Sequence, residues 1–305
     1  MTKVLVIVGP TASGKSTIAL EIAKRHNGEI ISADSMQVYK YMDIGTDKVP
    51  LSQRKEIPHH LIDITYIKEP FSVARYQRLA RQAVNDILGR GKLPIIAGGT
   101  GLYVRALIDD LKFPGGKVEN KVRKDLEDEL KEKGIDHLFK ILAEIDPEAI
   151  TFIDKRNHRR VIRALEVYRL TGKPFSQYRT DWRNYKPVFD AIIVGLKLTR
   201  ELLYKRINQR VEEMIEKGLI DETRNLLKMS FKEAVVSRQA LGYKELFDYF
   251  DGRATLPESI ETIKKRTRNY AKRQLTWFKK DPRIVWIDAR DKNKIISEVE
   301  YLLQV

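Results

Sequence analysis

Residues 9–16 read Gly-Pro-Thr-Ala-Ser-Gly-Lys-Ser and fit the phosphate-binding pattern G-x-x-x-x-G-K-[ST], the P-loop of nucleotide-binding and ATP-binding proteins. Glycines at the fixed positions let the backbone turn its N–H groups inward, toward an anion. Lys15 would reach the terminal phosphate as a point charge, and the Ser16 hydroxyl would hold a magnesium ion. The predicted phosphate-binding residues are Gly9, Pro10, Thr11, Ala12, Ser13, Gly14, Lys15 and Ser16.

A carboxylate follows the next apolar run of the chain. The segment EIISADSMQVY places Asp34 directly after residues 29–33, and ligands of open parallel sheets bind at the carboxyl ends of the strands. Asp34 could therefore accept a proton beside the phosphates, or it could cap the turn at residues 35–39. The run at 93–97 ends in Gly-Gly-Thr rather than in the Asp with which typical ATPases hold magnesium, so the pattern does not indicate nucleotide hydrolysis.

Strand and helix patterns alternate around these residues. Continuous apolar runs predict buried strands at 4–8, 29–33, 93–97, 191–198 and 284–287. Helical periodicity predicts helices at 16–26, 72–88, 102–107 and 201–217. This alternation is typical of a doubly wound parallel sheet, so the sequence predicts an α/β fold with a P-loop NTPase-like core.

The central part of the chain differs from this pattern. Polar helical patterns at 121–133, 137–145 and 161–170 follow one another without a strand between them. The sequence therefore predicts an all-helical insertion at 114–187 within a core made of residues 1–113 and 188–305.

The composition limits the kind of partner and chemistry. The chain of 305 residues has 57 Lys and Arg against 42 Asp and Glu, a formal charge of +15. This excess favours a polyanionic partner, nucleic acid before an anionic membrane, although a generally basic protein would show it too. The chain has no cysteine, which excludes disulfides, thiolate metal sites and cysteine nucleophiles. Without a signal-like or membrane-spanning segment, a cytoplasmic protein is expected.

Eight colinear segments between residues 9 and 278 resemble the tRNA dimethylallyltransferase (isopentenyltransferase) family, in its shorter bacterial form. They are GPTASGKS, ISADSMQVYKYMDIGTDK, PHHLID, AGGTGLYVRAL, RALEVYRLTGKP, LYKRINQRV, LGYKE and RQLTWF. The resemblance implies transfer of a dimethylallyl group from dimethylallyl diphosphate to the exocyclic amine of the adenosine 3′ of the anticodon, in tRNAs that read codons beginning with U. The phosphate loop, with Mg²⁺, would then hold a diphosphate leaving group.

The resemblance also implies roles for individual residues. Asp34 would accept the amine proton, Thr11 would lie near the reacting centre, and Arg206 would oppose the loop as a cation. Arg210, one helical turn further along, would assist in binding the phosphates, whereas without the resemblance both arginines read as a solvated helix face. The implied tRNA contacts are Asp34, Ser35, Met36, Gln37, Gly101, Lys124, Arg159, Arg160, Val161, Ile162 and Arg163.

Two basic segments could attract an RNA backbone. They are KRNHRRVIR at 155–163, in the insertion that the resemblance places at the tRNA anticodon region, and residues 264–280, which contain no acid. Tyr270 and Trp277 in the second segment could stack on bases or pack in the core. A monomer is expected. Two other functions stay open: a P-loop small-molecule kinase, and a non-catalytic RNA-binding protein, against which the intact Lys15, Ser16 and Asp34 argue.

Overall fold

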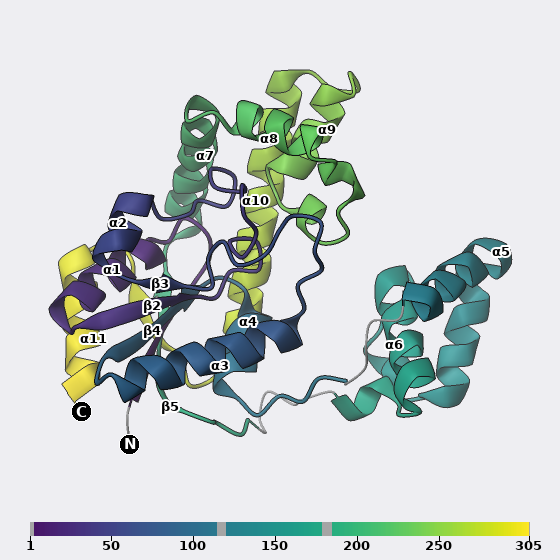
Figure 1. Cartoon of the computed structure of the whole chain (residues 1–305), viewed down its shortest axis with the longest axis horizontal. Helices are drawn as coiled ribbons and strands as arrows, with labels where there is room; N and C mark the ends of the chain where they lie inside the picture. Colours follow the sequence, from purple (N-terminus) through teal and green to yellow (C-terminus); the bar gives the residue numbers. More distant parts are fainter. Residues whose placement is uncertain (1–2, 115–119, 179–184, 305) are drawn as a thin grey trace. The chain divides into compact units, whose positions relative to one another are not determined.

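The chain forms two compact units (Figure 1). The computed structural model describes residues 3–114, 120–178 and 185–304. The core unit consists of Met1–Asp110 and Lys186–Val305, and the insertion unit of Leu111–Tyr185. The insertion therefore begins and ends slightly earlier than the 114–187 that the sequence predicts.

The core unit is built on a six-stranded parallel sheet in the described part of the chain, with the order β3-β2-β4-β1-β5-β6. The strands are β1 (Lys3–Val8), β2 (Gly28–Ser32), β3 (His59–His60), β4 (Leu93–Gly98), β5 (Asp190–Lys197) and β6 (Val285–Asp288). The predicted α/β, doubly wound, P-loop-like fold is confirmed. Strand β3 has only two residues, too few to leave an apolar pattern in the sequence.

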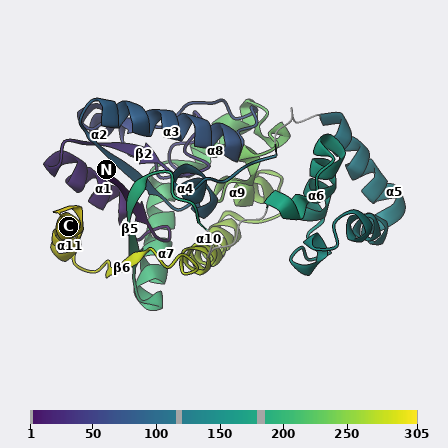
Figure 2. The same cartoon turned by 90° about the horizontal axis from the view of Figure 1, so that it is seen from below.

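Helices cover both faces of the sheet (Figures 1 and 2). Four of them are α1 (Lys15–Arg25), α3 (Val73–Gly89), α4 (Gly101–Ile108) and α11 (Lys292–Gln304). Leu5 and Ile7 of β1 share one hydrophobic cluster with α1 and α11, whereas Val4 and Val6 share another with α3 and α4. Successive side chains of a strand point to opposite faces, so the unbroken apolar run of β1 serves two cores.

A group of helices follows β5 and packs onto the phosphate loop, residues 9–16. The group comprises α7 (Arg200–Glu216), α8 (Leu219–Lys228), α9 (Tyr243–Phe250) and α10 (Leu256–Phe278) (Figure 1). Ala12 of the loop forms a cluster with Leu203 and Ile207 of α7 and Ala271 of α10. The second half of the chain thereby covers a loop that the first few residues supply.

The insertion unit has a small core of its own. Helix α5 (Asn120–Ile145) breaks at Gly134, where φ is 78°, so it consists of the two helices that the sequence predicts. Helix α6 (His158–Thr171) packs against it through a cluster that includes Leu138, Leu142 and Leu165.

The core residues on either side of the insertion are held side by side. The Asp110 N–H donates to the Lys186 carbonyl at 2.8 Å, and the Val188 N–H donates to the Ile108 carbonyl at 2.8 Å. The buried Asp109 carboxylate also accepts hydrogen bonds from the Arg283 guanidinium at 2.6 and 3.0 Å. The points where the chain leaves and re-enters the core are therefore fixed. Across the described residues, none of the helices combines the length and apolar character that crossing a bilayer requires.

Candidate active site

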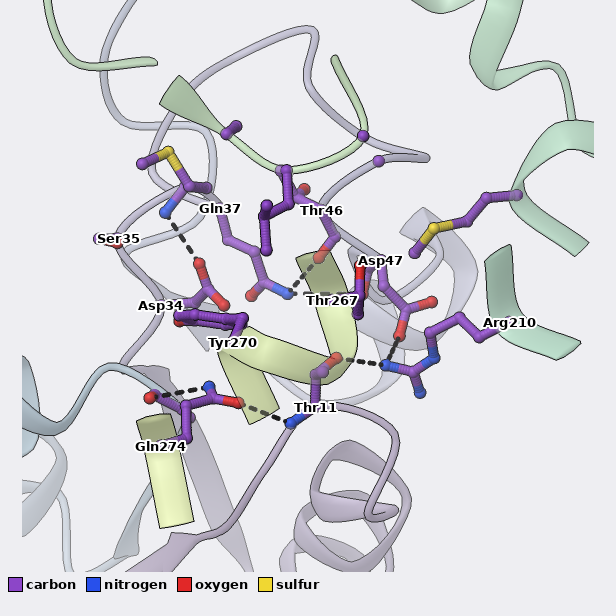
Figure 3. A pocket seen from close by; sticks show the side chains of 18 of the residues that line it. Thr11, Asp34, Ser35, Gln37, Thr46, Asp47, Arg210, Thr267, Tyr270 and Gln274 are labelled. Carbon is purple, nitrogen blue, oxygen red and sulfur yellow. Dashed lines mark hydrogen bonds and ion pairs between the residues drawn. The ribbon is translucent and has the colours of Figure 1, made fainter. Parts of the chain in front are cut away.

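A cavity of about 340 Å³ lies in the core unit, where β1, β2 and β4 end (Figure 3). The loops after these strands contribute Thr11, Lys15 and Ser16, then Asp34 to Gln37, and then Gly98 and Gly99. Helices α7 and α10 close the cavity from the other side with Arg210, Tyr270, Arg273 and Gln274, among others. The phosphate loop and Asp34, which the sequence relates only by topology, thus line one space.

Lys15 is held inside the phosphate loop. Its Nζ donates to the Pro10 carbonyl at 2.6 Å. Burial, aided by the neighbouring Arg210 cation, lowers the pKa of Lys15 to about 7. A diphosphate placed here would favour the charged ammonium and raise that pKa again. Ser16, in the first turn of α1, faces the same cavity with its side chain exposed.

Asp34 both caps a turn and faces the cavity. Its Oδ1 accepts a hydrogen bond from the Met36 N–H at 2.8 Å, as the capping interpretation predicts. Burial nevertheless raises the pKa of Asp34 above its ordinary value, although the N–H groups of Met36 and Gln37 oppose this shift. A carboxylate of raised pKa is a better proton acceptor. The two sequence-based interpretations of Asp34 are therefore compatible.

Arg210 supplies the cation opposite the loop. Its Nη1 lies 3.3 Å from Thr11 Oγ1 and 3.0 Å from Asp47 Oδ2 (Figure 3). Arg206, one turn earlier on α7, is half-buried and does not line the cavity. Arg210 therefore lines the cavity beside the phosphate loop and Arg206 does not, and the role of Arg206 as the opposing cation stays a prediction.

Asp47 is a second cavity carboxylate, which sequence reasoning missed. The acidic side chain in MDIGTDK was the only available signal, and nothing in that segment relates it to α7. The loop that carries Asp47 is fixed by Glu222 of α8, whose carboxylate accepts hydrogen bonds from the N–H groups of Asp43, Ile44 and Gly45 at 2.9–3.1 Å. Glu222 also accepts from the Tyr243 hydroxyl at 2.6 Å.

The remaining lining gives the cavity an apolar side and an aromatic wall. Val211 and Met214 of α7 and Ile263 of α10 provide apolar surface. Tyr270 also lines the cavity, and burial together with the nearby Asp34 charge raises its pKa, so the phenol stays protonated. Of the two interpretations of Tyr270, the structure supports a cavity position rather than a core position.

Gly101 and Trp277 pack directly on each other. A Cβ atom added to Gly101 would lie 1.9 Å from Cδ1 of the Trp277 ring, so the ring needs the space that glycine leaves. The Trp277 side chain is still 37% exposed. Trp277 therefore has a packing partner in the core unit and an exposed side, and the tRNA contact of Gly101 stays a prediction.

The insertion residues with implied tRNA contacts fall into two groups. Lys124, Arg159 and Arg160 are exposed, and Arg160 also lies over the Phe152 ring. Val161 and Ile162 are 0% and 4% exposed within the insertion core, so their side chains pack inward rather than toward a partner. The resemblance implies that these two residues contact tRNA, and the structure corrects this expectation for their side chains. A helix that exposes one basic face buries its opposite, apolar face.

The basic residues of the two segments are partly neutralised within the chain. Arg163 pairs with the buried Glu166 at 3.0 Å, and Arg266 of α10 pairs with the buried Glu245 at 2.8 Å. Lys265 and Lys272 of α10 are exposed and, seven residues apart, lie on one face of the helix. Together with the exposed Arg273, and with Lys279 and Lys280 after the end of α10, they form the surface of this segment that could attract phosphates.

The residues fit a magnesium ion only together with a substrate. Among the described residues, no three His, Asp or Glu side chains converge as a metal cluster. Magnesium is commonly held by one or two protein groups and by the phosphates of the substrate itself. Ser16, beside Lys15 in the cavity, fits this arrangement.

Comparison with known proteins gives a consistent result. The profile of a family described as IPP transferase matches residues 37–281. A tRNA dimethylallyltransferase of Carboxydothermus hydrogenoformans is 51% identical over 302 residues, which cover 97% of each chain. A crystal structure of a tRNA isopentenylpyrophosphate transferase from Bacillus halodurans has a TM-score of 0.73 and 43% identity, covering 100% of this chain and 96% of that one.

A eukaryotic dimethylallyltransferase, solved acting on tRNA, has a TM-score of 0.78 and 33% identity over 95% of this chain and 75% of its own. Identity of this extent, together with the matching fold, covers both the phosphate loop and the helices that close the cavity. The chain therefore belongs to the IPP transferase family.

Proposed function

We propose that the protein transfers the dimethylallyl group of dimethylallyl diphosphate to the exocyclic amine of the adenosine 3′ of the anticodon, in tRNAs that read codons beginning with U. The observation that carries this proposal is one cavity that combines a phosphate loop, the half-buried carboxylate of Asp34 and an apolar side. The prenyl donor needs the phosphate loop for its diphosphate and the apolar side for its dimethylallyl group. The amine of the acceptor needs the carboxylate. Family membership supports the same reaction.

The groups around the cavity match the charge changes of the reaction. The bond between the allylic carbon and the diphosphate oxygen breaks, and its electron pair leaves with the diphosphate. The N–H groups of the phosphate loop, Lys15 and Arg210 would stabilise this developing charge. Magnesium, held by Ser16 and the diphosphate, would supply a further positive charge. The amine nitrogen forms the new bond to carbon and loses its proton to the Asp34 carboxylate.

The acceptor adenine would have to leave the anticodon stack to reach Asp34. Enzymes that act on a base extrude it into a pocket, at a cost of a few kcal/mol in unstacking. Ser35, Met36 and Gln37 line the cavity next to Asp34 and would contact the extruded base. The exposed Lys124, Arg159 and Arg160 of the insertion and the lysines of α10 would bind the RNA backbone.

We further propose that the protein acts as a monomer in the cytoplasm. The support is that each group assigned to the reaction comes from the same chain, and that the proposed acceptor is a tRNA. A small-molecule kinase is not favoured, since the relatives over the whole length are prenyltransferases. A non-catalytic RNA-binding protein would not need the buried Asp34 and Lys15.

The test is a transfer reaction with dimethylallyl diphosphate labelled in its prenyl group, magnesium and unmodified tRNA. We expect label in tRNA at the adenosine 3′ of the anticodon, with one diphosphate released for each group transferred. A tRNA transcript in which that adenosine is replaced by guanosine serves as the matched control. Label in the control, or no label in either RNA, would contradict the proposal.

A further inference from the structure

The side chain of Gln274 joins two of the loops that form the cavity. Gln274 lies on α10, is 5% exposed, and faces the cavity (Figure 3). Its Oε1 accepts a hydrogen bond from the Thr11 N–H at 2.9 Å, and its Nε2 donates to the Gly99 carbonyl at 2.9 Å. One amide group thus bridges the phosphate loop after β1 and the turn after β4.

Thr11 is consequently held from two helices. Gln274 of α10 binds its backbone N–H, and Arg210 of α7 lies 3.3 Å from its hydroxyl. In a phosphate loop the backbone N–H groups usually bind the anion. The Thr11 N–H differs, because it donates its hydrogen bond to Gln274. The orientation of Thr11 is therefore set by side chains about 200 residues or more away along the chain, as the separations of 199 and 263 show.

The turn on the other side of Gln274 leads directly to Asp34. The Thr100 N–H donates to the Ala33 carbonyl at 3.1 Å, and the Thr100 hydroxyl accepts from the Ser35 N–H at 3.1 Å. The residues on both sides of Asp34 are thus bound to the residue that follows Gly99. Since β2, β4 and β1 are adjacent in the sheet, Gln274 and the turn at Gly99–Thr100 together connect the two neighbours of Asp34 to Thr11.

Gly99 is fitted to the Gln274 amide. A Cβ atom at residue 99 would lie 2.0 Å from Nε2, a distance that no side chain could tolerate without displacing the amide. The close approach of backbone and amide is therefore possible only with glycine at this position.

We infer that Gln274 is a positioning residue, which fixes Thr11 relative to Asp34 across the ends of three strands. The inference rests on the proposed function, in which Asp34 takes the proton of the attacking amine, and Thr11, as part of the phosphate loop, would lie on the side of the diphosphate. The amine and the diphosphate must lie on opposite sides of the allylic carbon, and a misplacement of about 1 Å at such a site can reduce the rate about a hundredfold. In this role Gln274 acts through the Thr11 N–H and the Gly99 carbonyl, both of which its side chain binds.

The first test is Gln274→Leu, which keeps the shape and removes both hydrogen bonds. We expect kcat for transfer to tRNA to fall about a hundredfold, with KM for both substrates within about threefold. The matched control is Gln82→Leu, on the exposed side of α3, which should leave kcat unchanged. Gly99→Ala should reproduce the kcat loss. A folded Gln274→Leu protein with the kcat of the wild type would overturn the inference.

The second test, Gln274→Glu, separates positioning from simple packing. A protonated Glu can still accept from the Thr11 N–H and donate to the Gly99 carbonyl, whereas the ionised form places a negative charge against that carbonyl. We therefore expect the ratio of variant to wild-type kcat to fall about tenfold or more as the pH rises, over a pH range in which circular dichroism shows that both proteins stay folded. A ratio that is independent of pH would contradict the inference, even if Gln274→Leu proved unfolded.

The same assay distinguishes failure of this inference from failure of the proposed function. Absence of label in tRNA with the wild-type protein would refute the proposed transfer itself. Normal transfer by the wild type together with normal transfer by the Gln274 variants would refute only the positioning role.

Discussion

Asp34 has the surroundings of a proton acceptor, and its removal should separate chemistry from binding. Asp34→Asn retains an oxygen that can accept from the Met36 N–H, so the turn should be preserved. We expect kcat to fall about 10²- to 10⁴-fold, the range typical of a lost general base, with the tRNA dissociation constant within a few fold. Single-turnover transfer and filter binding measure the two quantities. A normal turnover rate would remove Asp34 as the base.

The raised pKa of Asp34 also fixes the direction of the pH dependence. Only the ionised carboxylate accepts a proton, so kcat should rise with pH through a midpoint above the ordinary aspartate range. In Asp34→Asn this acidic limb should disappear from whatever activity remains.

Lys15 should make diphosphate binding depend on pH in the opposite sense. Its pKa is about 7 in the free protein and would be higher beside a diphosphate, so binding takes up a proton above pH 7. We expect the dissociation constant of magnesium diphosphate to increase up to about tenfold per pH unit above 7. Lys15→Arg is the control, because the arginine stays charged. Any pH dependence of its binding therefore comes from the diphosphate itself. Identical calorimetric pH profiles for the two proteins would contradict the assignment.

Local sequence could predict only part of the site at this scale. Lys15, Ser16 and Asp34 follow from a motif and from the ends of predicted strands. Arg210 was expected only through the family resemblance. Asp47 and Gln274 enter the cavity through contacts between distant segments, so no spacing within any one segment reveals them. Which of Arg206 and Arg210 lines the cavity likewise depends on how α7 is rotated against the phosphate loop. The sequence alone does not settle this, because both residues lie on one helix face.

Among the elements, the loop before α2 (Leu51–Glu56) is held by a side chain from a distant helix, Glu222 of α8. Glu222 satisfies three successive backbone N–H groups there, which turns the loop so that Asp47 faces the cavity. In Glu222→Gln an amide NH₂ would face some of these donors and leave at least one unpaired. We expect a loss of about 1–3 kcal/mol in unfolding free energy and faster amide exchange at residues 43–47.

The control for this change is Glu298→Gln on α11, whose only neighbour at ion-pair distance is Lys294, 3.8 Å away among the described residues. An exposed pair of this kind should change stability by less than about 1 kcal/mol. If Glu222→Gln exchanged its loop amides as slowly as Glu298→Gln, the loop would be held by other contacts.

Elements with a strong local pattern were predictable, and those that depend on neighbours were not. The unbroken apolar runs of β1 and β5 identify buried parallel strands because both sheet faces are covered. The break of α5 follows from Gly134. Strand β3 is short and is defined by its pairing with β2, whereas the short helices α8 and α9 depend on packing against α7 and α10, respectively.

At the scale of the whole molecule, the charge of +15 should appear as salt-dependent binding to tRNA. Arg159 and Arg160 are exposed at the start of α6, whereas Arg163 and Arg169 are bound to Glu166 and Glu129 and should be left in place. Replacing Arg159 and Arg160 with Gln should weaken tRNA binding and reduce the slope of log K against log salt by roughly 0.7–0.9 per lost phosphate contact.

Arg290→Gln is the matched control, since Arg290 is exposed in the core unit and already paired with Asp288 at 2.8 Å. Its salt slope should equal that of the wild type. An unchanged slope in the α6 variant would mean that this helix does not meet the RNA backbone.

The paired backbone segments at Ile108–Asp110 and Lys186–Val188 bring together the two ends of the chain that flank the insertion. Because the two ends meet at an antiparallel bridge between Asp109 and Pro187, a turn of a few residues would suffice to join them. The α/β core could thus have existed before the helical insertion was added. Loss or exchange of the insertion would leave the connections between the strands of the sheet unchanged.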